Sequence, residues 1–231
     1  MKPNRLLTLM FPAIVAFGVV TTSGCTDDDI DNITNPDTSA SASATDSTSS
    51  STTDTTSGIS IAEKTGMIFM REEEKLAHDV YLTLYETWNQ QIFDNIAQSE
   101  QKHMDAVLTL LNTYDVPDPI GDNGRGVFVD EDLQKLHDQL VNQGISSLID
   151  ALQVGAAIEE IDIIDLKQRE EDIVGHDDIT NTYEMLLMGS RNHLRAFVKD
   201  LKAQGIDYQP QYLSQSDFDE IINSDRERGN H

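Results

Sequence analysis

Basic residues are scarce in this sequence: its 231 residues contain 16 Lys and Arg against 41 Asp and Glu, a formal net charge of −25. With this charge we expect no attraction to nucleic acid or to anionic lipid surfaces. Cysteine is nearly absent too, since Cys25 is the only one. A single cysteine cannot form an internal disulfide, and the lack of thiolates argues against an iron–sulfur cluster or a structural zinc site.

Proline and long apolar runs are also scarce after the first sixty residues. The aliphatic residues there recur at helical and not at alternating spacing, which predicts an all-α domain. An extended apolar run does occur at residues 6–20, directly after Lys2 and Arg5. This run is too short and too near the start for a stable membrane span, and it is typical of a secretory signal.

Small residues precede the lone cysteine in the string Thr22-Ser-Gly-Cys25. The string resembles a bacterial lipobox, which implies that residues 1–24 are a signal peptide and that Cys25 is lipidated. Thr22 departs from the pattern, because an aliphatic residue usually stands three positions before the cysteine. The resemblance predicts a protein of the bacterial cell envelope, anchored to a membrane through Cys25. Simple secretion and an uncleaved anchor remain the alternatives.

Residues 25–60 are dominated by Ser, Thr, Asp and Ala, and Ile30 and Ile33 are the large apolar residues before residue 59. Such a composition cannot bury enough surface to offset its conformational entropy, so we expect a disordered tether. Glycosylation of this stretch is an alternative interpretation. The folded domain is therefore predicted at residues 61–231.

Four long segments beyond residue 60 place apolar residues at the alternating three- and four-residue steps of an amphipathic helix. They span about residues 61–88, 93–114, 146–168 and 178–203. Few residues join the first segment to the second or the third to the fourth, so each pair is expected to form an antiparallel hairpin. The domain is long enough to bury a single core.

The join between the second and third segments is much longer. It contains a turn-rich piece at residues 115–126 and a shorter predicted helix at about residues 130–142. Such a join can cross the length of a bundle, so that the second and third helices run parallel. Two hairpins with one long crossover form a ferritin-like four-helix bundle, the fold that we predict. A short outer helix is expected from an N-cap at Ser214 to Ile222.

Polar residues interrupt the middle of the apolar stripes of these helices. An ionised carboxylate in a dry core is costly unless a cation or a hydrogen-bond donor compensates it. Carboxylates and imidazoles on several stripes therefore predict a shared metal site in the interior. The candidate ligands are, in chain order, Glu74, Glu100, His103, Glu159, Asp162 and His193.

One known class of bundle binds two metal ions with a Glu from each of two helices and a Glu-x-x-His from each of the other two. Glu100 and His103 form such a motif, whose three-residue step puts both side chains on one face. Ser190 stands where the last helix should offer its Glu. Asp162, one turn beyond Glu159, could supply the missing carboxylate.

Simpler interpretations compete with this one. The acidic and histidine residues could form a metal-free buried network, or the stripes could be rotated so that these groups meet solvent. Glu160 would compete with Asp162 if the third helix were rotated. His78, four residues after Glu74, is expected to be a hydrogen-bonded residue at the flank of the site.

The remaining polar residues near the stripes are given structural roles. Tyr81 and Tyr183 are interpreted as core aromatics whose hydroxyls reach polar partners. Glu72 and Glu73 are assigned to the outer face of the first helix, where a run of charge is usually solvated.

Two strings in the first two segments resemble the rubrerythrin and ferritin-like superfamily: Glu74-Lys-Leu-Ala-His-Asp-Val-Tyr81 and Phe93-Asp-Asn-Ile-Ala-Gln-Ser-Glu-Gln-Lys-His103. More closely, residues 67–222 resemble a bacterial ferritin-like family of unknown function known as DUF2202. The strings shared with that family are Glu72-Glu-Glu-Lys-Leu-Ala77, Asn95-Ile-Ala-Gln-Ser-Glu-Gln-Lys-His-Met104, Ile158-Glu-Glu-Ile-Asp-Ile163 and Ser190-Arg-Asn-His-Leu-Arg-Ala-Phe197. The resemblance implies the fold and no particular reaction.

Carboxylates with one or two imidazoles suit iron or manganese. We predict two bound ions, iron in the first place, with manganese or a mixed pair as alternatives. The expected activity is that of an oxidoreductase acting on peroxide, dioxygen or ferrous iron. In this hypothesis Glu100 and Glu159 bridge the ions, Glu74 is terminal, and His103 and His193 bind one ion each.

Partners follow from the same hypothesis. Rubrerythrin-type peroxidases usually carry a cysteine-built rubredoxin module, which this chain lacks, so a redox role requires a separate electron donor. The oligomeric state stays open, a homodimer included. The alternative function is a membrane-tethered helical binding or interaction module whose metal is structural or absent.

Overall fold

The computed structural model describes residues 58–228, and this part of the chain forms six helices and no strand. The helices are α1 Ile61–Trp88, α2 Gln91–Thr113, α3 Glu131–Gly144, α4 Leu148–Glu170, α5 Asp177–Ala203 and α6 Gln215–Asn223. The all-α prediction is confirmed, and each helix lies within a few residues of its predicted range. The predicted signal peptide, Cys25 and the tether up to residue 57 lie outside the described residues.

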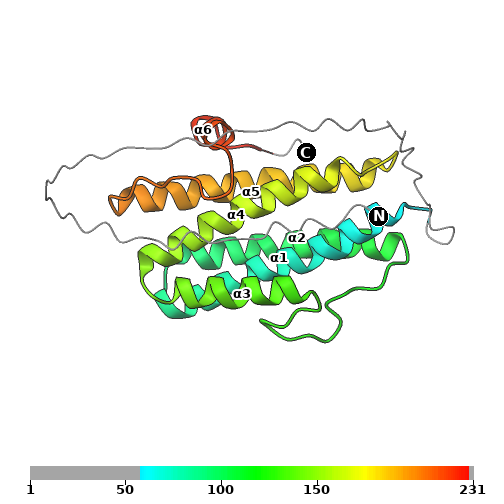
Figure 1. The fold of residues 1–231 in the computed structure, drawn as a ribbon, viewed down its shortest axis with the longest axis horizontal. Coiled ribbons are helices and arrows are strands. Elements are labelled where there is room, and N and C mark those ends of the chain that lie inside the picture. The colour runs from blue at the N-terminus through cyan, green and yellow to red at the C-terminus, as the bar shows by residue number, and fades with distance from the viewer. Residues whose placement is uncertain (1–57, 229–231) are drawn as a thin grey trace, which may run out of the picture. The chain divides into compact units, whose positions relative to one another are not determined.

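The four long helices pack as two hairpins (Figure 1). Helix α1 packs against α2 and α4 against α5, while α1 also contacts α4 and α2 contacts α5. The turn between α1 and α2 is short because Asn89 adopts the left-handed conformation, with φ 51°, directly after Trp88. The two hairpins therefore enclose one shared interior.

The crossover from α2 to α4 consists of residues 114–130 and α3. Helix α3 packs against α1 and α4 and carries the chain back along the bundle, so that α2 and α4 run in the same direction (Figure 1). Asp130 caps α3 by accepting hydrogen bonds from the backbone N–H groups of Asp132 and Leu133. The parallel arrangement expected from the length of this join is confirmed.

Side-chain caps fix where other helices begin. Ser60 and Glu63 form a reciprocal capping box at the start of α1, and Ile59, just before it, is fully buried. Ser147 caps α4 and Ser214 caps α6. The predicted N-cap at Ser214 is thus confirmed, and the folded part begins slightly before residue 61.

An aromatic cluster fills the core on one side of the bundle's middle. The ring of Phe197 lies 5.4 Å from that of Tyr81 and 5.9 Å from that of Phe93, measured between centroids. Phe197 also packs on Gly155 of α4, where an added Cβ would lie 2.4 Å from the ring. The glycine thus lets α5 approach α4 one turn before Glu159.

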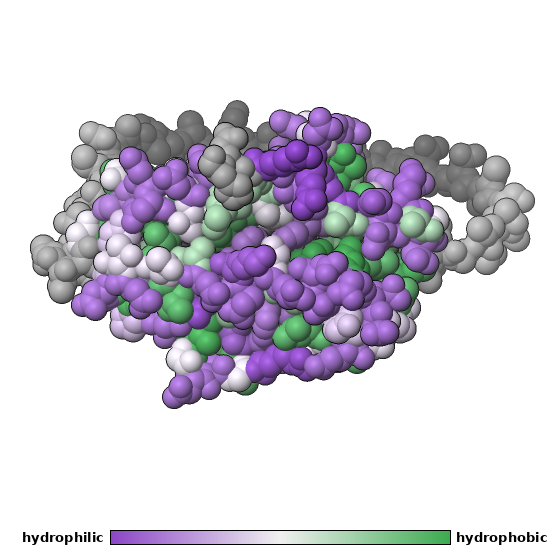
Figure 2. Space-filling model, turned by 180° about the vertical axis from the view of Figure 1, so that it is seen from behind, coloured by the Kyte–Doolittle hydropathy of each residue, from purple (hydrophilic) through white to green (hydrophobic). Residues whose placement is uncertain are grey.

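The surface agrees with the acidic composition. Figure 2 shows a face on which hydrophilic residues predominate and apolar residues form smaller areas between them. Among residues 58–228, none of the helices combines the length and apolarity that spanning a membrane requires.

Candidate metal centre

Side chains from all four long helices meet in the interior between the two hairpins. Helix α1 contributes Glu74, α2 contributes Glu100 and His103, α4 contributes Glu159, and α5 contributes His193. Glu74 is 1% exposed, and Glu100 and Glu159 are 2% exposed each. The structure therefore brings these five predicted residues together from four helices, four of them buried and His193 half-buried.

The first group of potential ligands consists of Glu74, Glu100 and His103. The Nδ1 atom of His103 lies 2.7 Å from Glu100 Oε2 and 3.2 Å from Glu74 Oε2. One ligand atom from each of the three residues lies within 4.8 Å of the others. This spacing is compact enough for the three atoms to share one cation.

The second group consists of Glu100, Glu159 and His193. The Nδ1 atom of His193 lies 2.8 Å from Glu100 Oε1 and 3.4 Å from Glu159 Oε2. Glu100 belongs to both groups, and it turns one oxygen toward each imidazole. The imidazole rings are stacked with centroids 5.6 Å apart. The cluster is therefore a pair of triads joined by a single carboxylate.

Several atoms in the cluster are close to one another without forming a hydrogen bond of good geometry. Glu100 Oε1 and His193 Nδ1 are 2.8 Å apart, yet both are buried without a hydrogen-bond partner. Glu74 Oε1 is also buried and unpartnered. Buried polar atoms are almost always satisfied, and oxygen and nitrogen donors that converge in this way suit a shared cation. The donor set thus fits a metal ion.

The carboxylates and imidazoles of the cluster shift one another's pKa values. Burial raises the pKa of Glu74 to about 7, against the opposing effect of His103. Burial opposes ionisation of Glu100 too, but His103 and His193 together lower its pKa below the usual range. Burial disfavours the charged form of His193, yet Glu100 and Glu159 raise its pKa to about 10. Glu100 is thus the carboxylate that stays ionised most readily.

Hydrogen bonds from outside the triads orient two of the potential ligands. The hydroxyl of Tyr81 donates to Glu159 Oε1 at 2.6 Å, and His193 Nε2 lies 3.1 Å from the hydroxyl oxygen of Ser99. Such contacts fix the rotamer of a ligand and the tautomer of a histidine. The predicted polar partner of Tyr81 is confirmed, whereas the buried hydroxyl of Tyr183 has no hydrogen-bond partner.

Asp162 lies beside the cluster but outside both triads. The hydroxyl of Ser190 donates a hydrogen bond to Asp162 Oδ2, and Asp162 Oδ1 is buried without a partner. Burial, and then the charges of Glu74 and Glu159, raise the pKa of Asp162 well above its usual range. A serine at position 190 therefore leaves the space that the Asp162 carboxylate enters from α4.

Sequence reasoning missed the contribution of Gly189. A Cβ atom added at this position on α5 would lie 2.5 Å from Nε2 of His103 and 2.6 Å from its Cε1. The bare backbone of Gly189 thus allows the imidazole to lie between α2 and α5 with Nδ1 directed at the carboxylates. A glycine one residue before Ser190, in the middle of a long helix, was the available signal.

Two neighbouring candidates point away from the centre. Glu160 is fully buried, but it accepts hydrogen bonds from Tyr208 Oη at 2.6 Å and from the backbone N–H groups of residues 211–213. It thus holds the C-terminal segment and does not compete with Asp162. His78 hydrogen-bonds Asp79 at 2.9 Å and takes no part in the triads.

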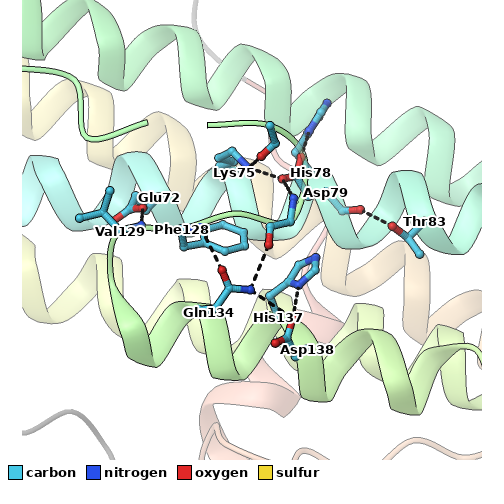
Figure 3. A network of polar contacts seen from close by, with 12 residues as sticks. Glu72, Lys75, His78, Asp79, Thr83, Phe128, Val129, Gln134, His137 and Asp138 are labelled. Carbon is cyan, nitrogen blue, oxygen red and sulfur yellow. Dashed lines mark hydrogen bonds and ion pairs between the residues drawn. The ribbon is translucent and has the colours of Figure 1, made fainter. Parts of the chain in front are cut away.

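The prediction that Glu72 and Glu73 are solvated was wrong, because both are buried. The crossover covers the side of α1 that carries Glu72 (Figure 3). The carboxylate of Glu72 accepts hydrogen bonds from the backbone N–H groups of Val129 and Asp130. Glu73 faces α4 instead, near Asp165. Residues on the crossover are distant in sequence, so periodicity on α1 alone could not reveal this cover.

The structure thus defines a class: an all-helical protein in which two hairpins enclose a carboxylate–histidine cluster assembled from four helices. Residues 63–225 match the family model described as "Uncharacterized protein domain (DUF2202)", and the chain belongs to that family. The resemblance of residues 67–222 to DUF2202 is confirmed at the level of that family.

A relative and a solved structure extend this comparison. The chain is 53% identical over 171 residues to Uncharacterized protein MJ0754 of Methanocaldococcus jannaschii, covering 74% of this chain and 92% of the relative. It is also similar to the crystal structure of hypothetical protein MJ0754 from Methanococcus jannaschii DSM 2661. That match has a TM-score of 0.69 at 52% identity and covers 71% of this chain and 93% of the other. Since this relative is archaeal, the family is not confined to bacteria.

Proposed function

We propose that the protein is a ferritin-like four-helix bundle that binds two iron ions, one in each triad. The observation that carries the proposal is the position of Glu100, which directs one oxygen toward His103 and the other toward His193. A carboxylate shared in this way is what a pair of ions a few ångströms apart requires. Manganese, or one ion of each metal, suits the same oxygen and nitrogen donors.

The chain's own residues divide into distinct roles under this proposal. Glu100 would be shared by the two ions, Glu74 and His103 would complete one position, and Glu159 and His193 would complete the other. A second bridge through Glu159 remains a prediction, because that residue belongs to one triad. Tyr81 holds Glu159 through a hydrogen bond and Ser99 holds His193.

The proposed chemistry is that of an oxidoreductase acting on peroxide, dioxygen or ferrous iron. A bound iron pair supplies electrons to such oxidants. The residues around the centre limit its contact with bulk water, since Glu74, Glu100, His103 and Glu159 are buried and Tyr81 of the aromatic cluster contacts Glu159. Asp162 and its partner Ser190 make the two positions unequal, which favours one ion that is held less firmly than the other.

Location and partners belong to the same proposal. Export through the N-terminal signal and lipidation of Cys25 would place the domain at the cell envelope, tethered to a membrane. Electrons for a redox cycle would then come from a separate donor protein. A homodimer is compatible with this arrangement.

One observation favours a second candidate function, a helical binding or interaction module without a catalytic metal. In the metal-free cluster both imidazoles already lie against carboxylates, so the buried charges partly compensate one another. A stable apo bundle could therefore present its outer surface to a partner and leave the interior inert.

Metal analysis of the full-length chain separates these functions. We expect two ions per chain after anaerobic loading with ferrous iron, followed by charge-transfer absorption of oxidised iron when oxygen is admitted. A double variant, Glu100→Ala with His103→Ala, should take up no iron. A stable wild-type protein that neither binds iron nor responds to oxygen would contradict the di-iron function and favour the binding module.

A matched double variant provides the control. Glu184→Ala with His78→Ala removes the same residue types outside the triads, and it should retain two ions. Circular dichroism of both metal-free variants establishes that each is folded, since removing carboxylate repulsion from the core is expected to leave the apo bundle intact. Unchanged stoichiometry in the Glu100/His103 variant would show that the ligands are misassigned.

A further inference from the structure

Buried polar atoms without hydrogen-bond partners gather on one side of the centre, where α1 faces α4 and the start of α5. Both carboxylate oxygens of Glu73 are in this state, as are Asp162 Oδ1, Arg169 Nε and the hydroxyl of Tyr183. Native proteins leave few such atoms, and ordered water or an ion normally accounts for the exceptions. The concentration of these atoms in one region therefore points to a hydrated interior.

Glu73 is the central residue of this region. Its side chain is fully buried beside Glu74 on α1, and it faces the carboxylates of Asp162 and Asp165 on α4. A buried carboxylate that lies beside two further carboxylates, with Arg169 as the neighbouring positive charge, is an unfavourable arrangement for an empty core and a favourable one for a passing cation.

The row of carboxylates reaches toward the surface through α4. Asp165, one turn after Asp162, is partly exposed. Arg169, a further turn along, stacks its guanidinium on the ring of Phe69 at 3.7 Å from the centroid. On α1, Gly66 lets Arg169 and Tyr183 approach the helix closely, since an added Cβ would lie 3.2 Å from the Tyr183 hydroxyl and 3.8 Å from Arg169 Cδ. The polar row thus runs from solvent along the α1–α4 contact to the centre.

We propose that Asp165, Glu73 and Asp162 form an access path for a divalent cation, which leads from solvent between α1 and α4 to the Glu74–Glu100–His103 triad. The inference rests on the proposed function, since a path is needed only if ions reach the centre. Each carboxylate replaces part of the ion's hydration shell, and water completes it. The strongly negative chain draws cations toward its surface, and the row guides them inward.

The opposite edge of the centre is less suited to this role. The His193 side chain is 12% exposed there, but its Nε2 atom lies 3.1 Å from the Ser99 hydroxyl and its Nδ1 faces Glu100. An ion arriving at that edge would have to displace an imidazole that is itself a predicted ligand. The carboxylate row requires no such displacement.

Loading kinetics test the path separately from the site. Apo full-length protein is mixed with Co²⁺ in a stopped-flow instrument, and binding is followed by the visible absorbance of the bound ion. Glu73→Gln keeps the size of the side chain but weakens its hold on a cation, so we expect the loading rate constant to fall ~10-fold with the final stoichiometry unchanged. Asp165→Asn should slow loading in the same direction.

Glu184→Gln, the same substitution at an exposed position on α5, controls for the loss of one surface charge and should load at the wild-type rate. Wild-type loading of two ions together with wild-type rates in both Glu73→Gln and Asp165→Asn overturns the path and leaves the site standing. A lower stoichiometry in Glu73→Gln also overturns it, because Glu73 would then be a ligand. Failure of the wild-type protein to bind Co²⁺ overturns the proposed function and the path with it.

Discussion

Two faces of α1 carry buried charge, and they differ in how that charge is satisfied. On the crossover face, Glu72, Lys75 and Asp79 are each matched by partners from the crossover (Figure 3). On the interior face, Glu73 and Glu74 keep oxygens without hydrogen-bond partners. Both sets lie within two turns of the same helix and are similarly buried.

On the crossover face, the buried charges have hydrogen-bond and ion-pair partners. Lys75 forms an ion pair with Asp79, donates to the carbonyl of Gly124 at 2.9 Å and lies 4.6 Å from the ring centroid of Phe128. Asp79 in turn accepts the backbone N–H of Gly126 at 2.8 Å. A buried ion with full matching is a structural element, whereas one with unsatisfied lone pairs is available for a ligand. The comparison thus separates scaffold from site on one helix.

The largest effect on the stability of the metal-free protein is expected from Lys75→Met. Removing one partner of a buried ion pair leaves the other charge uncompensated, so the free energy of unfolding should fall by about 3 kcal/mol. Urea unfolding of metal-free protein measures the change. Lys135→Met, at an exposed position of α3, should change it by less than about 0.5 kcal/mol. Equal effects at the two positions would remove the basis for calling Lys75 part of the scaffold.

A smaller loss, about 1–3 kcal/mol, is expected from Gly189→Ala, because the added methyl group overlaps the His103 ring. The ring must move away from Glu74 and Glu100, so metal analysis should find one ion per chain instead of two. Gly124→Ala is the control, since an added Cβ there meets no atom within 4 Å. Retention of two ions by Gly189→Ala would show that the position of His103 does not matter for binding.

The smallest effect, and one of opposite sign, is expected from Glu74→Gln in metal-free protein. Burial raises the pKa of Glu74 to about 7, so the folded state holds its proton more tightly than the unfolded chain does. The wild-type protein should therefore lose stability as pH rises from about 4.3, the usual value for Glu, to the raised folded value. The variant lacks this loss, and above pH 7 it should be more stable by about 1 kcal/mol.

Urea unfolding at pH 5 and pH 8 tests that prediction, and Asp79 gives a contrast on the crossover face. Although burial opposes it, His78, Lys75 and the Gly126 N–H lower the pKa of Asp79. The contribution of Asp79 to the free energy of unfolding is thus present above its ordinary pKa of about 3.9. It is lost only as the pH falls through the lowered pKa of the folded state. Identical pH profiles for wild type and Glu74→Gln would contradict the assigned environment of Glu74.

The sequence was sufficient to predict the helices and the five residues that meet in the centre, because both depend on periodicity within one helix. Ser60, Ser147 and Ser214 also mark helix starts through local hydrogen bonds. The burial of Glu72 was not predictable in this way, since its partners Val129 and Asp130 are distant in sequence.

One local signal could have corrected the error. Residues 71–75 are five consecutive charged residues, and at about 3.6 residues per turn they surround the helix completely. A helix covered on several sides must then bury some of them. Neither the surroundings of Glu73 nor the fit of His103 against Gly189 could be obtained without coordinates, since both depend on how closely two helices approach.

The adjacent residues Glu159 and Glu160 connect the C-terminal segment to the centre through α4. Side chains at neighbouring helical positions point about 100° apart, and here one joins the centre while the other receives Tyr208 and the backbone of residues 211–213. The docked segment therefore fixes the angle of α4 about its own axis. A rotation of α4 that withdraws Glu159 from the centre would also break the hydrogen bonds that Glu160 accepts. Release of the C-terminal segment and displacement of Glu159 are therefore coupled events.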